Sequence, residues 1–447
     1  MKEYDIVIIG GSAAGLTAGI TARRFYSDKK ILIVRKEKNV LIPCGIPYIY
    51  GTVGSPAKNL IPDTILEKNN IDLLLGEVEQ IETEQKILKV VENEDIKYEK
   101  LIIATGSDPI VPPIKGSDKE NVFVVKKDDE YLNHLLDTVN KSKNMAIIGG
   151  GFIGMEFADE CKKNRNINIS IIEMLPHCLM FTFDEEFCLH AEDLIREKGI
   201  KIITNDKVES ITGDKKAEGV RLASGQTIEA DTVLMGIGSK PNSKIAEQAG
   251  IKVNQKGAIV VNRYMQTSGK DIFSCGDCCN KVSFFNKKPS NLMLASIATN
   301  EARIAGANLY KINRVNEGVI GTYSTVIGET ALSRAGISVR EAKENGYDIV
   351  IGTAEAPNCH PGCMPGSCNL KVTLVFEKGS GILLGGELMG AKSGGELINL
   401  ISGCIHERMS ANDIATFQMG THPALTASPI AYQISNAAEI AIKELRK

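Results

Sequence analysis

The candidates for chemistry in this chain are its thiols and a few imidazoles. Its 447 residues include 11 cysteines and 6 histidines. An odd number of cysteines cannot all pair, and thiols in a reducing compartment are more often buried, catalytic or metal-binding than structural. Cys44 lies in Pro43-Cys44-Gly45-Ile46-Pro47-Tyr48, where Pro47 suits the first position of a helix. A thiol just ahead of a helix N-terminus is favoured as the thiolate, so Cys44 is the predicted nucleophile.

A second group of thiols lies in one ten-residue segment. Its members are Cys359, His360, Cys363 and Cys368. Their spacing matches no standard metal-ligand pattern, so we assign no metal ligands. We expect a thiol-rich loop. The alternatives are thiols that exchange electrons with Cys44 across a dimer, or a metal or cluster site.

The chain contains one mononucleotide-binding pattern twice. In the first copy, a strand at 5–9 leads into Gly10-Gly11-Ser12-Ala13-Ala14-Gly15 and a helix at 16–25. In the second, a strand at 145–148 leads into Gly149-Gly150-Gly151-Phe152-Ile153-Gly154 and a helix that ends near 163. Strand, glycine turn and helix indicate a βαβ unit and a parallel sheet. The turn lets backbone N–H groups stabilise a pyrophosphate, which predicts two dinucleotide sites. The expected binding residues are Gly10, Ser12, Ala14 and Gly15 in the first copy and Gly149, Gly151, Phe152, Ile153 and Gly154 in the second.

The residue that ends the next strand of each copy bears on the nucleotide. In the second copy Glu173 can accept a hydrogen bond from a ribose 2′-OH and would repel a 2′-phosphate. The two residues after Glu173 are not basic, so NADH is favoured over NADPH. In the first copy Ser12 replaces the middle glycine and Arg35 stands where an acid is usual. Glu37, two residues later, is the candidate for the adenosine ribose.

The rest of the chain completes three domains. Residues 101–104 lead into Thr105-Gly106 and residues 232–235 into Gly236-Ile237-Gly238, two strands that end in small residues where backbone approaches a ligand. After about residue 320, strand-like segments precede helical ones, which indicates a separate α+β domain.

Composition excludes some partners. A formal net charge of -3 gives no reason to expect nucleic acid or an anionic membrane surface. No apolar run is long enough to span a bilayer. A strand predicted from Tyr4 leaves no room for a signal peptide, so we expect a cytoplasmic protein.

Taken together, these motifs resemble the pyridine nucleotide-disulfide oxidoreductase family of FAD enzymes, and the match covers the whole chain. The motifs that carry it are Gly10–Gly15, Ala104-Thr105-Gly106, Gly149–Gly154, Gly236-Ile237-Gly238 and Ser274-Cys275-Gly276-Asp277. The resemblance implies an α/β fold: an FAD-binding domain at 1–113 and 244–320, an NAD-binding domain at 114–243, and a dimerisation domain at 321–447. It therefore implies a homodimer.

The resemblance also implies residue roles. Asp277 would bind the ribityl chain of FAD, Ala295 would lie near the isoalloxazine, and Phe152 would gate the nicotinamide site. His422, in a segment similar to the family's His-Pro motif, would act from the partner subunit. Ala427 stands where the family places the glutamate that orients that histidine, which puts a strong base in doubt. The remaining expected cofactor contacts are Val78, Ala104, Thr105, Gly106 and Gly238.

Details at Cys44 indicate a branch of the family. Classical members carry two cysteines, but here Asn39 and Ile49 occupy the positions of a partner. This is similar to the single-cysteine branch: NADH oxidases and peroxidases, coenzyme A disulfide reductases, and persulfide or polysulfide reductases. Ala13 replaces the histidine usual in peroxidases and water-forming oxidases. We therefore predict electron transfer from NADH through FAD and Cys44 to a persulfide, polysulfide or coenzyme A disulfide. The alternatives are an NADH oxidase, or a flavin redox sensor or electron-transfer partner.

Overall fold

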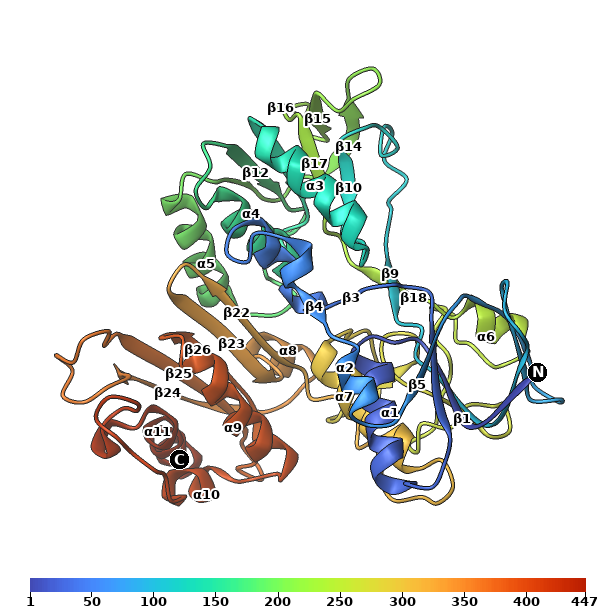
Figure 1. Cartoon of the computed structure of the whole chain (residues 1–447). Helices are drawn as coiled ribbons and strands as arrows, with labels where there is room; N and C mark the ends of the chain where they lie inside the picture. The colour runs from blue at the N-terminus through green and yellow to red at the C-terminus, as the bar shows by residue number, and fades with distance from the viewer. The chain divides into compact units, whose positions relative to one another are not determined.

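A computed structural model describes every residue of the chain, Met1–Lys447. The chain divides into two compact units (Figure 1). Unit 1 comprises Met1–Pro113, Phe123–Lys141 and Ile237–Val319, and unit 2 comprises Ile114–Val122, Ser142–Gly236 and Ile320–Lys447. No helix combines the length and apolar character that crossing a bilayer requires.

Unit 1 is built on a seven-stranded sheet in the order β5-β2-β1-β8-β7-β6, with β19 paired to β8. Its strands are β1 (Lys2–Ile9), β2 (Ile31–Arg35), β5 (Asp72–Leu75), β6 (Val78–Glu82), β7 (Ile87–Val90), β8 (Ile96–Ile103) and β19 (Ile272–Ser274). The pairs of β1 with β2 and β8, of β2 with β5, and of β19 with β8 are parallel. Helices α1 (Ala13–Phe25) and α7 (Ala295–Ala307) pack against each other. The first βαβ prediction is confirmed.

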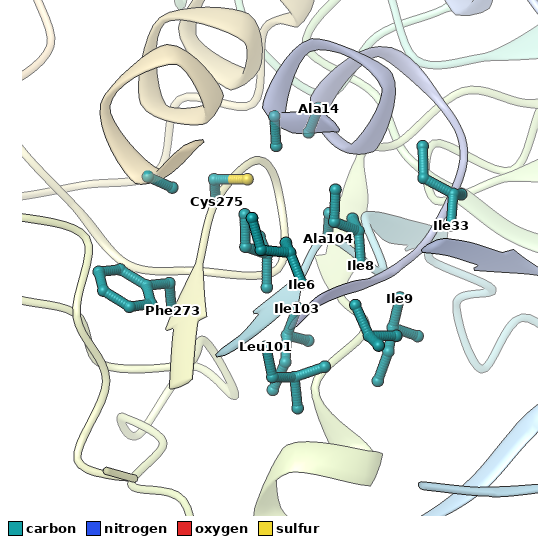
Figure 2. Packing of buried hydrophobic residues seen from close by; sticks show 14 of the residues in the cluster. Ile6, Ile8, Ile9, Ala14, Ile33, Leu101, Ile103, Ala104, Phe273 and Cys275 are labelled. Carbon is teal, nitrogen blue, oxygen red and sulfur yellow. The ribbon is translucent and has the colours of Figure 1, made fainter. Parts of the chain in front are cut away.

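The core of unit 1 lies along the parallel strands. A parallel strand covered on both faces is apolar throughout rather than alternating. β1 follows this rule from Ile6 to Ile9, and Ile6, Ile8 and Ile103 have no exposed surface. Figure 2 shows these side chains together with Cys275, which follows β19 and is fully buried. This core fixes the strand ends from which the binding turns project.

Unit 2 contains the second βαβ pattern and the C-terminal α+β layer. Parallel strands lie in the order β17-β11-β12-β13, with β17 (Thr232–Met235), β11 (Asn144–Ile148), β12 (Asn168–Ile172) and β13 (Lys201–Ile203). Helix α4 (Phe152–Lys162) follows β11 and α5 (Glu185–Glu197) follows β12. A small antiparallel sheet of β14 (Val208–Thr212), β15 (Gly219–Leu222) and β16 (Thr227–Glu229) adjoins them.

The C-terminal part of unit 2 has a five-stranded antiparallel sheet in the order β22-β23-β26-β25-β24. The strands are β22 (Thr322–Ile327), β23 (Thr330–Gly336), β24 (Ile349–Pro357), β25 (Asn369–Glu377) and β26 (Leu383–Gly390), and the helices are α8 (Val339–Glu344), α9 (Gly394–His406), α10 (Ala411–Thr416) and α11 (Gln433–Leu445). α11 lies so close to β24 that a Cβ on Gly352 would meet the Ala437 oxygen at 1.8 Å. The predicted α+β layer is confirmed. The three-domain boundaries remain a prediction.

Candidate functional site

The first glycine turn forms a cradle at the start of α1. Gly10 has φ +106°, and a Cβ there would lie 2.2 Å from the Ala104 oxygen. A Cβ on Gly15 would lie 1.8 Å from the Gly10 oxygen, and one on Gly276 would lie 2.9 Å from Ala14 Cβ. Ser12 caps α1 without a side-chain hydrogen bond. The first N–H groups of α1 therefore remain available to an anion, which fits the pyrophosphate of FAD.

The end of β2 explains the basic residue in the first copy. Arg35 is 2% exposed and forms a two-pronged ion pair with Asp63 at 2.7 and 2.8 Å. Its Nε also donates to the Glu37 oxygen at 2.9 Å, and its aliphatic chain fills the space above Gly11. Arg35 therefore has a structural role. Glu37 stays a prediction as the ribose ligand.

Asp277 lies in a loop that a buried ion pair supports. Ser107 Oγ donates to Asp277 Oδ2 at 2.8 Å. Beneath the loop, Glu301 accepts from Gly276 N at 2.9 Å, and Lys281 Nζ donates to the Gly276 oxygen at 2.7 Å and to Glu301 at 3.2 Å. Both charged side chains are 2% exposed. Burial raises the pKa of the Glu301 carboxyl, and Lys281 acts against that rise.

This arrangement leaves open space beside Asp277. A cavity of about 550 Å³ has Asp277, Pro241 and Met293 on its wall. Gly106 lies close to this wall, because its oxygen accepts from the N–H group of Asn242, the residue after Pro241, at 2.9 Å. Sequence reasoning missed Lys281 and Glu301, because nothing in either segment by itself indicates that the two residues pair.

The three cysteines beside Asp277 are packed as expected. Cys275, Cys278 and Cys279 are at most 3% exposed. Burial raises the pKa of Cys275 and Cys279 well above that of an ordinary thiol. None of the 11 cysteines is in a disulfide. These thiols therefore suit packing better than nucleophilic chemistry.

Cys44 lies in a tight turn and is exposed. The turn is a 3₁₀ helix, Pro43–Gly45, followed by a second at Pro47–Tyr50 with Pro47 first, as predicted. A helix this short supplies little dipole, so the electrostatic reason for a thiolate is weaker than the sequence suggested. Asn59 fixes the turn, since its Nδ2 donates to the Ile42 oxygen at 2.9 Å and its side chain packs against Gly45.

The two positions at which a second cysteine would be expected, Asn39 and Ile49, make other contacts in the fold. Asn39 Nδ2 donates to Asp129 Oδ2 at 2.8 Å. Ile49 has no exposed surface. Neither residue carries a thiol that could form a disulfide with Cys44. Cys44 therefore has the only thiol on this turn.

The second glycine turn matches the first. Gly149 has φ +105°, and a Cβ on Gly154 would lie 1.9 Å from the Gly149 oxygen. Gly151 caps α4 without a side-chain hydrogen bond. Glu173 is 9% exposed and accepts from Gly150 N at 2.7 Å and from Leu175 N at 2.8 Å. Its carboxylate thus orders the turn, and its role toward the ribose stays a prediction.

An aromatic cluster surrounds the predicted gate. The Phe152 ring stacks on Tyr323 of β22 at 5.8 Å between centroids and meets Phe183 edge-on at 6.0 Å. The Arg334 guanidinium lies 6.0 Å from the Tyr323 ring, and Glu387 is its partner across β23 and β26. Phe152, the predicted gate, therefore packs against Tyr323 of the C-terminal sheet, a contact that sequence reasoning missed because the two residues lie far apart in the chain.

Glu387 should make stability depend on pH. Burial raises the pKa of its carboxyl from 4.5 to about 8, and Asp184 adds to this while Arg334 opposes it. Between these values the folded protein holds a proton that the unfolded chain has released, so the free energy of unfolding falls as pH rises through this window. The Glu387→Gln protein should not show this decrease in the free energy of unfolding. At high pH it should be more stable than wild type by roughly 2–4 kcal/mol.

Urea unfolding at about pH 5 and about pH 8.5 measures the effect. The exposed Glu229→Gln is a matched control and should follow wild type at both values. Equal pH dependence in wild type and Glu387→Gln would show that the carboxyl is ionised throughout.

His422 and the cysteine-rich loop lie together in unit 2. His422 is exposed, and Ala424 N donates to its Nδ1 at 3.2 Å. His360 N donates to the Pro423 oxygen at 2.9 Å, so the loop at 359–368 packs on the segment that carries His422. No group of three or more His, Cys, Asp or Glu side chains is arranged to hold a metal, so the structure gives the metal alternative no support. Cys44 belongs to unit 1.

Two protein-family models match the chain. Pyridine nucleotide-disulphide oxidoreductase matches residues 4–302, and the dimerisation domain of the same family matches residues 322–430. A curated NADH oxidase from Methanocaldococcus jannaschii is 29% identical and covers 98% of this chain and 99% of its own. An NAD(P)H sulfur oxidoreductase (CoA-dependent) from Pyrococcus furiosus is 30% identical over 88% of this chain and 89% of its own.

A solved structure also matches over nearly the full length. The NAD-dependent persulfide reductase from A. fulgidus is 30% identical, has a TM-score of 0.90, and covers 98% of this chain and 83% of that chain. The predicted fold class and family resemblance are confirmed, including the C-terminal dimerisation domain. The chain belongs to the pyridine nucleotide-disulphide oxidoreductases, FAD- and NAD(P)H-dependent flavoproteins.

Proposed function

We propose that this chain is an NADH-dependent sulfur reductase that acts on persulfides, polysulfides or a coenzyme A disulfide through Cys44. The observation that carries the proposal is the exposed Cys44 on a turn whose second-cysteine position is filled by Asn39, bonded to Asp129. Because this turn carries no second cysteine, we expect the sulfur that accepts electrons to belong to the substrate. The sulfur reductases among the relatives support this substrate class.

The residues suit this chemistry as follows. FAD, when bound, relays two electrons from the nicotinamide to sulfur. The Cys44 thiolate attacks the outer sulfur of a persulfide RS–SH, which forms Cys44–S–SH and releases RS⁻. Addition of two electrons then cleaves the new sulfur–sulfur bond, releases HS⁻ and restores the thiolate. The uncapped starts of α1 and α4 would hold the pyrophosphates of FAD and NADH, with Asp277 on the ribityl chain.

The test is anaerobic NADH oxidation over a panel of sulfur acceptors. We expect turnover with polysulfide, with hydrosulfide released in equal amount to NADH consumed. Turnover that requires oxygen and ignores every sulfur acceptor would favour the NADH oxidase alternative, which the full-length relative from M. jannaschii supports. A single stoichiometric reduction without turnover would indicate a sensor instead.

The preference for NADH should depend on Glu173. Glu173→Ala is expected to raise the Michaelis constant for NADH and to narrow the difference between NADH and NADPH. The loss of a hydrogen bond from a hydroxyl to a charged acceptor corresponds to roughly 10-fold or more. Glu173→Gln is the second variant, because it removes the charge that repels a 2′-phosphate but keeps one of the two oxygens that accept from Gly150 N and Leu175 N. A wild-type enzyme that used NADPH more efficiently than NADH would contradict the role of Glu173 in nucleotide preference.

A homodimer fits the C-terminal domain. Leu425 and Ile430 are 72% and 88% exposed in the segment that carries His422. Large apolar side chains this exposed in one segment are typical of a surface that a second copy covers. The dimer would then bring His422 to the active site of the partner subunit.

A further inference from the structure

The ring nitrogens of His422 have different partners. Ala424 N–H donates to Nδ1 at 3.2 Å, so Nδ1 presents its lone pair. A neutral imidazole carries one proton, which must then be on Nε2. The family pattern is the reverse, with a glutamate that accepts from Nδ1–H and leaves Nε2 as the base. Here Ala427 stands in that place, 3% exposed, and no carboxylate forms an ion pair with the His422 ring.

The backbone around this histidine is held from two sides. His422 N donates to Thr426 Oγ1 at 3.0 Å within the turn. From the cysteine-rich loop, His360 N donates to the Pro423 oxygen at 2.9 Å, and His360 Nδ1 is 3.0 Å from the Thr426 oxygen. Cys359 Sγ lies 3.6 Å from the Ala424 oxygen. These contacts fix the peptide whose N–H group reaches Nδ1, so the loop has a positioning role that its cysteine pattern did not reveal.

We propose that His422 acts on the sulfur substrate as a neutral hydrogen-bond donor through Nε2–H, and not as a base. This inference rests on the proposed function. When the Cys44 thiolate attacks a persulfide, negative charge develops on the leaving RS⁻, and an N–H group aimed at that sulfur stabilises it. No proton has to be removed, because Cys44 attacks as the thiolate. The proton stays on Nε2, RS⁻ departs, and the only covalent changes are the sulfur–sulfur bond formed and the one broken.

The first measurement is the tautomer itself, by ¹⁵N NMR of the holoenzyme labelled at histidine nitrogen. Comparison with His422→Gln assigns the His422 signals among those of the six histidines. We expect a proton-bearing signal for Nε2 and an unprotonated one for Nδ1. A proton on Nδ1 of the neutral ring would overturn the proposal. Because this readout needs no turnover, it is independent of whether the enzyme reduces sulfur.

The second measurement separates a donor from a base by substitution. A glutamine side chain offers an N–H donor near the position of Nε2 but cannot take a proton. His422→Ala should lower anaerobic turnover with polysulfide by about 10- to 100-fold, as expected for a lost hydrogen bond to a charged sulfur. His422→Gln should recover part of that loss, and His422→Asn, whose shorter amide does not reach as far, should recover less. Equal losses in all three variants would overturn the donor role.

The two arms also separate this inference from the proposed function. A wild-type enzyme without sulfur turnover, in which the ring still carries its proton on Nε2, contradicts the function alone. Sulfur turnover with the opposite tautomer, or without recovery by glutamine, contradicts only the donor role. Flavin content and dimer mass of each variant show whether the loss lies in the chemistry or in assembly.

Discussion

Cys44→Ser should lose turnover with sulfur acceptors by about a thousandfold or more, because serine keeps the shape of the turn but removes the nucleophile. The flavin should still be bound and still be reduced by NADH. The residues that we propose to hold FAD and NADH, Gly10–Gly15, Asp277 and Gly149–Gly154, lie on other segments of the chain. Reduction of the flavin in a stopped-flow experiment, followed by steady-state turnover, separates the two half-reactions.

The control for Cys44→Ser uses the other exposed thiols. Cys363 and Cys368 are exposed on the loop that packs against the His422 segment. Cys363→Ser and Cys368→Ser should leave turnover near the wild-type rate, because the side-chain contacts of the loop with the His422 segment come from Cys359 and His360. Near wild-type polysulfide turnover in Cys44→Ser would contradict the proposed exit of electrons. Cys363 and Cys368 would then be the next candidates for direct acceptors of electrons from the flavin.

Local signals in the sequence were enough for the two βαβ units. A β-branched strand, a glycine turn and a helix are each specified by neighbouring residues, so both turns formed where they were expected. The strand β23 (Thr330–Gly336) follows β22 after one tight turn and pairs with it. Its pairing with β26 is a contact between distant segments, which local patterns do not encode.

The supporting charges at the site were not predictable for the same reason. Lys281 and Glu301 come from separate segments and become partners only when α7 packs beside the Asp277 loop. Arg35 was an unexplained departure in the sequence until the fold placed Asp63 beside it. At the 3₁₀ turns around Cys44, by contrast, a local signal was present but incomplete. Pro47 correctly marked the first helical position, but its presence did not give the length or type of the helix.

The largest expected effect on the nucleotide side is that of Gly154→Ala. The new Cβ would lie 1.9 Å from the Gly149 oxygen, a backbone atom that cannot turn aside as a flexible side chain can. The first turn of α4 must therefore move away from β11, and the N–H groups that we propose for the pyrophosphate move with it. We expect NADH to reduce the flavin at least about 100-fold more slowly, since a misplacement of about 1 Å can cost this much.

Gly151→Ala is the matched variant, because no atom lies within 4 Å of the added Cβ and the residue is the cap of the same helix. The protein should fold as wild type does, with an unchanged melting temperature. The methyl group would nonetheless occupy the open side of the turn, where the pyrophosphate is expected. The affinity for NADH should therefore fall in both variants, but only Gly154→Ala should also melt earlier. Normal NADH binding by Gly151→Ala would mean that the dinucleotide does not approach α4 at its cap, and the second βαβ unit would then serve packing alone.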